Sequence, residues 1–179
     1  VRRPALVIVL CLMVPVLAQA GGRREPEINP AGVFRQTIAV AVPELAGQEL
    51  QVRLRFGAGH FSLAPGGKHL LLEGVAQYNN ELFQPTLQQQ GRRISLAAGD
   101  GRLELKEFID LWGKVKDHMN RWDLKLAAVP MELEMDLGAC STRLELGGVP
   151  LRRLRLSQGF SDIALSFDRP NPLAMEELS

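Results

Sequence analysis

The side chains that could do chemistry in this chain are few and scattered. Its three histidines, His60, His69 and His118, have no cysteine or carboxylate around them at metal-ligand spacing. A nucleophilic triad could be drawn from Ser62, His60 and an aspartate, but the sequence lacks the Gly-x-Ser-x-Gly elbow that presents such a serine. Gly57-Ala58-Gly59 lacks the lysine and the following helix of a phosphate loop. We therefore predict no catalytic residue, no cofactor, no metal and no enzymatic activity.

A row of acidic residues is the first remaining candidate for binding. Glu132, Glu134 and Asp136 alternate with apolar residues, which places all three carboxylates on one face of a strand. Carboxylate oxygens in such a row could hold calcium. The same alternation exposes the row to solvent, where arginines of a neighbouring strand could neutralise it. We favour this second interpretation.

A basic stripe is the other candidate. Arg152, Arg153 and Arg155 stand close together near the C-terminus, and guanidinium groups suit phosphate and carboxylate ligands. Balancing the acidic row is their simpler role. Together with Trp112, these arginines are our candidate contact surface for an unknown envelope protein or a wall polymer.

The N-terminal segment, residues 1–20, has the three-part pattern of a secretory signal peptide. Arg2 and Arg3 are followed by an uncharged apolar run from residue 5 to residue 17, and Ala18-Gln19-Ala20 forms a small-x-small cleavage site. We therefore expect an exported protein. The alternative is an uncleaved anchor, because residues 4–22 carry no charge and could just span a bilayer. The protein would then be a membrane-tethered regulator, and we expect membrane contact only in that case.

Composition excludes several classes of protein. The 179 residues carry 21 Lys and Arg against 20 Asp and Glu, a net charge of +1 that argues against a general nucleic-acid binder. A hydrophobic content of 46% with 23% charged residues is that of a globular domain. Cleavage after Ala20 would leave Cys140 as the one cysteine, and its apolar surroundings predict a buried side chain.

Period-two alternation predicts an all-β chain. Residues 50–56 and 131–137 alternate apolar and polar side chains, and further short runs between residues 37 and 97 are bounded by Gly, Asn or Pro. Around 105–121 the apolar residues adopt helical spacing, which predicts a helical or hairpin insertion. Trp122 opens the next strand and is expected in the core.

The C-terminal third repeats itself, with residue i aligned to residue i + 19. This register aligns Leu137 with Leu156 and Leu144 with Ile163, as in stacked windings of a β-solenoid. It also predicts three pairs of opposite charge on adjacent strands, namely Glu134–Arg153, Asp136–Arg155 and Arg143–Asp162. A leucine-rich repeat would share the Leu151-x-x-Leu154-x-Leu156 spacing, but its helical return and its Asn or Cys are missing.

Several short motifs resemble one known family. They are Gly57-Ala58-Gly59-x-Phe61-x-Leu63, Trp122-Asp123-Leu124-x-Leu126, Leu137-Gly138-Ala139 and Leu151-x-x-Leu154-x-Leu156-x-x-Gly159. Over roughly residues 50–172 the chain resembles the toast-rack domain of bacterial envelope proteins, which is similar in fold to LiaF-like cell-wall-stress proteins and to adhesin solenoids. The insertion at 105–121, Cys140 and Phe160 depart from the family pattern.

The resemblance implies a small β-solenoid outside the cytoplasmic membrane, with no known enzymatic activity. We expect a signal peptide at 1–20, a flexible leader at 21–35, the solenoid domain at 36–172 and a tail at 173–179. The expected function is that of an exported structural or interaction domain at the cell envelope, linked to stress sensing or adhesion. A carbohydrate-active or polysaccharide-binding protein is the alternative. Unpaired strand edges leave a homodimer through an edge open.

Overall fold

The computed structural model describes residues 26–44, 49–98 and 119–179. The predicted signal peptide and nearly all of the predicted insertion at 105–121, including Trp112, lie outside these residues. The described elements are β1 (Glu27–Ile28), β2 (Phe34–Ala41), β3 (Leu50–Pro65), β4 (Leu70–Tyr78), η1 (Glu81–Phe83), β5 (Pro85–Gln90), β6 (Arg93–Ala98), β7 (Asn120–Leu126), β8 (Met131–Glu145), β9 (Leu151–Gln158), β10 (Asp162–Ser166) and β11 (Glu177–Leu178). No helix among them has the length and apolar character needed to cross a bilayer.

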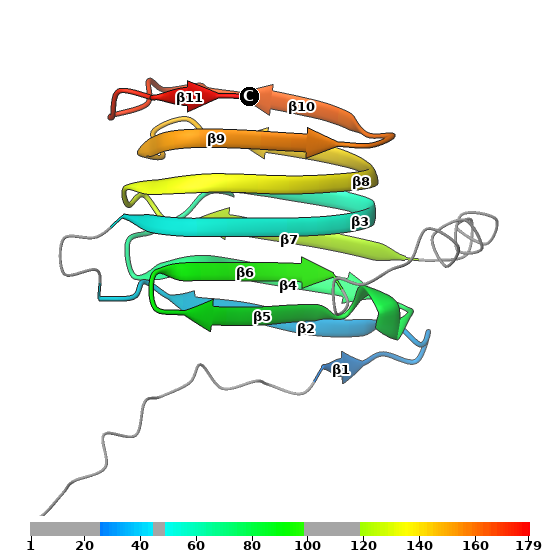
Figure 1. Cartoon of the computed structure of the whole chain (residues 1–179). Helices are drawn as coiled ribbons and strands as arrows, with labels where there is room; N and C mark the ends of the chain where they lie inside the picture. Colours follow the sequence, from blue (N-terminus) through cyan, green and yellow to red (C-terminus); the bar gives the residue numbers. More distant parts are fainter. Residues whose placement is uncertain (1–25, 45–48, 99–118) are drawn as a thin grey trace, which may run out of the picture.

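Two long strands, β3 and β8, hold the fold together because each contributes to two walls (Figure 1). The first half of each strand belongs to a wall with the order β5-β6-β3-β8-β9-β11, and the second half to a wall with the order β1-β2-β4-β7-β3-β8-β10. Alternating side chains from both walls point inward and form one apolar cluster. The result is a β-solenoid, as the sequence predicts.

Glycines form the bend at which the chain passes from one wall to the other. Gly57 of β3 and Gly138 of β8 lie beside one another, and a Cβ atom on Gly138 would stand 2.2 Å from the carbonyl oxygen of Gly57. The next winding stacks Gly159 over Gly138, with its amide donating to the carbonyl of Leu137. Neighbouring strands are only about 4.8 Å apart, so a tight bend stacked on a tight bend leaves no room for side chains between the backbones.

The predicted register of i with i + 19 is wrong by two positions. Glu132 and Arg153, which face each other across β8 and β9, are separated by 21 in the sequence. Leu133 accordingly pairs with Leu154, and Leu144 pairs with Leu165 on the other wall. Side chains of a strand alternate with period two, so a slip of two leaves every apolar side chain facing inward. The apolar pattern alone therefore could not distinguish the two registers.

The predicted apolar column survives this slip. Leu137 and Leu144 are buried in the core, and Leu156 and Ile163 pack against the same cluster. All four side chains therefore face one core, as the solenoid prediction requires.

The slip also makes the three predicted charge pairs wrong. Arg153 lies opposite Glu132 and not Glu134, and Arg155 lies opposite Glu134 and not Asp136. Across the other wall, Arg143 pairs with Ala164 and therefore not with Asp162. Acidic residues recur at every second position of β8, and basic residues do the same on β9. Opposite charges therefore face each other in either register.

The windings do not follow one another in chain order. β3 pairs with β8, which comes much later in the chain, as in Leu54 opposite Met135. On its other side β3 pairs with β6 in the first wall and with β7 in the second. The winding made by β6 and β7 therefore follows β3 in the sequence, but in space it lies on the side of β3 opposite to β8. Its part in the first wall ends at Ala98, and its part in the second wall begins at Asn120.

The solenoid extends beyond the expected limits of 36 and 172 at both ends. Before residue 36, β1 pairs with the start of β2. At the C-terminus, β11 pairs with β9 in parallel, and Leu178 lies opposite the buried Leu154. Strands as short as β1 and β11 give no periodic signal, which explains why the sequence suggested a leader and a tail.

Two expectations about single side chains are confirmed. Trp122 is fully buried, and its ring meets Phe56 edge-on with ring centroids 5.3 Å apart. Cys140 is buried with 6% of its surface exposed, and its Sγ lies 3.3 Å from Thr142 Oγ1. Burial raises the pKa of the Cys140 thiol above its ordinary value, while the contact with Thr142 opposes this.

Candidate functional site

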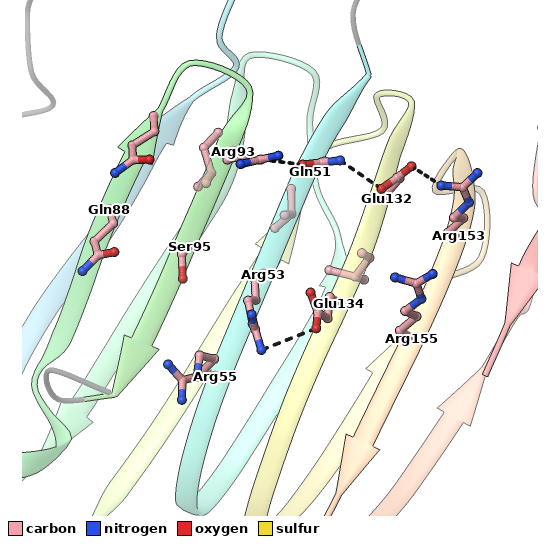
Figure 2. Close-up of a pocket in the computed structure, with 14 residues that line it drawn as sticks. Gln51, Arg53, Arg55, Gln88, Arg93, Ser95, Glu132, Glu134, Arg153 and Arg155 are labelled. Atoms are coloured by element: carbon pink, nitrogen blue, oxygen red, sulfur yellow. Dashed lines mark hydrogen bonds and ion pairs between the residues drawn. The ribbon is translucent and has the colours of Figure 1, made fainter. Parts of the chain in front are cut away.

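The first wall carries a polar depression of about 540 Å³ on its outer face (Figure 2). The neighbouring strands β5, β6, β3, β8 and β9 supply its lining, which consists of Arg, Gln, Glu and Ser side chains around a few aliphatic ones. Outward positions alternate with the core positions of the same strands, so the regular alternation of the sequence also builds this face. Two of the predicted contact residues, Arg153 and Arg155, are part of it.

A chain of hydrogen bonds crosses the depression from strand to strand (Figure 2). Arg93 Nε donates to Gln51 Oε1 at 3.0 Å, and Gln51 Nε2 donates to Glu132 Oε2 at 3.2 Å. Arg153 then bridges two carboxylates, with Nη1 donating to Glu132 Oε1 at 2.9 Å and Nη2 to Glu176 Oε2 at 2.8 Å. The polar side chains from β6 to the C-terminal segment thus act as one ladder.

A second ladder runs parallel to the first. Arg53 donates to Asp136 Oδ2 at 2.8 Å and lies 3.4 Å from Glu134 Oε1. Arg155 forms a two-pronged pair with Glu177, at 2.9 and 2.8 Å. The hydrogen bonds from Arg155 lower the pKa of Glu177 below its ordinary value. The acidic row is therefore held by arginines from the strands on either side, as the favoured interpretation expects.

Arg152 differs from the other two arginines of the stripe. The pairing of β8 with β9 shifts by one residue between Met131 and Glu132, so Arg152 is the extra residue of a β-bulge. It bonds Glu49 and Glu176 instead of facing the depression. The bulge also explains the Leu151-x-x-Leu154 spacing, since two outward residues here separate two buried leucines.

The sequence did not identify most partners in the two ladders. Gln51 is separated by 42 in the sequence from Arg93 and by 81 from Glu132, and the outward alternation of such residues was the only available signal. Glu176 and Glu177 lie in the expected tail. Only the parallel pairing of β9 with β11 brings them to the arginines.

We expect the contact between Glu132 and Arg153 to be measurable but small. A double-mutant cycle with Glu132→Gln and Arg153→Gln should give a coupling free energy of up to about 1 kcal/mol at low salt, because both groups are partly exposed. The coupling should shrink in molar salt, where screening is strong. Urea unfolding of the four variants measures it.

A second cycle, which serves as the control, combines Glu132→Gln with Arg121→Gln. The Arg121 side chain lies on the other wall and bonds Asp123. Distant changes should be additive within about 0.5 kcal/mol. A coupling as large in this control cycle as in the first would contradict the direct contact.

The second wall carries the other group of reactive side chains. A depression of about 520 Å³ there includes His60, Ser62, Arg121 and Asp123. Ser62 Oγ donates directly to Asp123 Oδ1 at 2.7 Å, and Arg121 Nε donates to Asp123 Oδ2 at 2.7 Å. In a nucleophilic triad the imidazole would take the serine proton. Here the Ser62 hydroxyl donates its hydrogen bond to the Asp123 carboxylate, and Arg121 holds that carboxylate in place.

These contacts predict a perturbed titration of Asp123. The hydrogen bond from Arg121, opposed by partial burial and aided by Ser62, lowers the pKa of Asp123 below its ordinary 3.8. Arg121→Gln should therefore raise this pKa, and Ser62→Ala should raise it less, as measured by carboxyl NMR titration. Since the folded pKa is lowered, the contact stabilises the native state above pH 3.8 and the effect is lost as pH falls through the folded value. An unchanged pKa in Arg121→Gln would contradict the geometry.

No group of three or more histidine, cysteine or carboxylate side chains within residues 26–44, 49–98 and 119–179 is placed to hold a metal ion. His60 lies on the second wall, opposite Arg121 and Ser141. His69 lies just before β4, where its carbonyl accepts from the amide of Val42. His118 lies outside the described residues.

Comparisons with known proteins agree with this architecture. A family model described as the N-terminal domain of toast_rack, DUF2154, matches residues 32–172. A crystal structure titled as a putative cell adhesion protein from Clostridium sporogenes superposes with a TM-score of 0.57 at 17% identity, covering 80% of this chain and 68% of that one. This similarity concerns the fold. Among curated proteins, none matches the chain.

Proposed function

The chain belongs to the family of toast_rack N-terminal domains, and on this premise we propose that it is an exported, non-catalytic contact domain of the bacterial cell envelope. The proposal has two parts, a location and a mode of action. The location is supported by the N-terminal pattern of charge, apolar run and small-x-small site. The mode of action is supported by the way in which the exposed polar groups are engaged.

The observation that carries the second part is the pair of ladders. A polysaccharide hydrolase needs one carboxylic acid that holds a proton and one free carboxylate, set about 5–9.5 Å apart beside the substrate. In the depression of the first wall, Glu132 forms an ion pair with Arg153, and Glu134 forms one with Arg53. These contacts give both carboxylates a structural role. A rigid wall with regularly spaced charged and amide groups is suited to contact and not to proton transfer.

The contact itself is proposed to use the outer face of the first wall. Charged rows on a regular sheet can be matched by a partner with the complementary rows, and such contacts are sensitive to ionic strength. The structural neighbour is titled as a putative cell adhesion protein. For the present chain, adhesion or the sensing of envelope stress through this face is the specific role that we propose, with an envelope protein or a wall polymer as partner.

Fractionation of a bacterial host that expresses the whole chain tests the location. We expect the chain in the soluble exported fraction, with Gly21 as its first residue by mass spectrometry. Ala20→Phe should block cleavage, because the cleavage site requires small residues at its first and third positions. Gln19→Phe is the matched control and should be processed normally. Recovery of the chain in the membrane fraction with Arg2 still present would contradict the proposal and favour a tethered regulator.

A further inference from the structure

At one end of the solenoid, the described strands leave a strand edge without a neighbour. At the other end, β2 and β1 close the second wall and β5 closes the first. At the C-terminal end, the first wall ends with the short β11, and β10 pairs with β8 and with no other strand that the structure describes (Figure 1). Terminal windings of solenoids need a cap that covers the core. Among the described residues no further strand lies beyond β10 and β11 at this end, where Met175 of the segment that connects them packs against the core cluster.

The open end exposes apolar side chains that elsewhere would be buried. Leu144 and Leu146 on β8 and its extension are fully buried, whereas Leu165 and Phe167, which follow on the next winding, are 37% and 40% exposed. Leu178 of β11 is 61% exposed although it lies over the buried Leu154. All these side chains point toward the inside of the solenoid. No strand that the structure describes lies over them.

The backbone of β10 is available for pairing on its outer side. The carbonyl of Ser166 accepts from Leu146 on the β8 side. Since the backbone groups of successive residues point to opposite sides of a strand, those of Ile163 and Leu165 point toward the free edge. The edge also lacks the usual protection by proline or lysine, whereas the edge strand β5 has Pro85 and three glutamines.

We propose that a second copy of the chain covers this end, with two β10 strands paired antiparallel about a twofold axis at Ala164. In this register Ile163 lies opposite Leu165 of the other copy, so apolar side chains meet on the inner face. The backbone amides and carbonyls of these two residues, which point toward the free edge, form hydrogen bonds between the copies. On the outer face Asp162 meets Ser166 of the other copy, which avoids a clash of like charges. Moving the axis to Leu165 would place Asp162 opposite Asp168 of the other copy. Charge therefore favours the axis at Ala164 over the axis at Leu165.

A cysteine cross-link tests both the dimer and its register. Ala164 would face its own counterpart in a pair without mutual backbone bonds, where Cα atoms stand about 4.5 Å apart, which is within disulfide range. The Ala164→Cys variant of the exported chain, mildly oxidised at micromolar concentration, should run as a covalent dimer. Ser166→Cys is the matched control on the same outer face and should not cross-link, because Ser166 faces Asp162. The native Cys140 is buried and does not compete.

Sedimentation velocity on the unmodified chain supplies the independent measurement. We expect a dimer that Leu165→Lys converts to a monomer, since this change places a charge in the apolar contact. Leu87→Lys, at a comparably exposed position on β5, should leave the dimer intact. Far-UV circular dichroism identifies any variant that fails to fold.

A wild-type chain that stays monomeric at hundreds of micromolar would overturn the proposal, as would equal cross-linking by the two cysteine variants. Capture of another protein by the open end of a monomer would also overturn it. These outcomes concern the oligomeric state only and leave the export test unaffected.

Discussion

Replacing Gly138 by alanine is expected to lower the free energy of unfolding by about 3 kcal/mol or more, the upper range for overpacking a closed site. The added Cβ would stand 2.2 Å from the carbonyl oxygen of Gly57, and that atom belongs to the backbone of β3. β3 is fixed by β6 and β7 on one side and by β8 on the other, so the oxygen cannot move without disturbing the pairing on both sides. Urea unfolding followed by circular dichroism measures the loss.

Two other glycines supply matched controls of graded severity. A Cβ on Gly159 would lie 3.3 Å from the carbonyl oxygen of Gly138, a tight contact that a small shift of the outer winding relieves. A Cβ on Gly67 would meet no atom within 4 Å. We therefore expect Gly159→Ala to destabilise mildly and Gly67→Ala to change stability by less than about 1 kcal/mol. If Gly138→Ala were as stable as Gly67→Ala, the stacking of the bends would be wrong.

Truncation of Trp122 to alanine is the second change with a large expected effect. The ring is fully buried and packs against Phe56 and Phe61, with centroid distances of 5.3 and 6.3 Å. Such a truncation costs about 3–5 kcal/mol, because it removes apolar contacts and leaves a cavity. These three rings join β7 to β3 at the bend, so the loss should affect both walls in one cooperative transition. Thermal and urea unfolding measure it.

Trp122→Phe separates the ring contacts from the rest of the side chain. The indole Nε1 has no hydrogen-bond partner among the described residues, so phenylalanine loses volume but also removes an unsatisfied buried donor. We expect a clearly smaller loss than for alanine. Leu87→Ala, at a residue that is 43% exposed, should change stability by no more than about 0.5 kcal/mol. Equal losses for alanine and phenylalanine at position 122 would argue against aromatic packing at this bend.

Features that depend on local periodicity were predictable. Alternation over 50–56 and 131–137 predicted strands with one buried face, and both segments are strands with that pattern of burial. Glycines marked the breaks between alternating runs, and an apolar neighbourhood predicted the burial of Cys140. Such signals lie within a few residues of one another, because side-chain direction in a strand is set by the backbone alone.

Features that depend on pairing between distant segments were not predictable in the same way. The observed register of β8 with β9, two positions away from the predicted one, keeps every apolar side chain directed inward. The placement of β3 between two windings that come later in the chain also keeps its apolar side chains directed inward. A single sequence therefore had no means of choosing between these arrangements. The bulge at Arg152 and the pairing of β11 with β9 followed from the same long-range contacts.

The sequence by itself determined that this protein is a β-solenoid with aliphatic side chains inside and charged rows outside, because an alternating pattern admits one direction for each side chain. Only the tertiary structure decided which winding lies beside which, and therefore which arginine holds which carboxylate. It also left β10 without a second neighbour among the described strands. Partners across strands are set by the register in which separate windings pair, and no property of a residue or of its chain neighbours encodes that register.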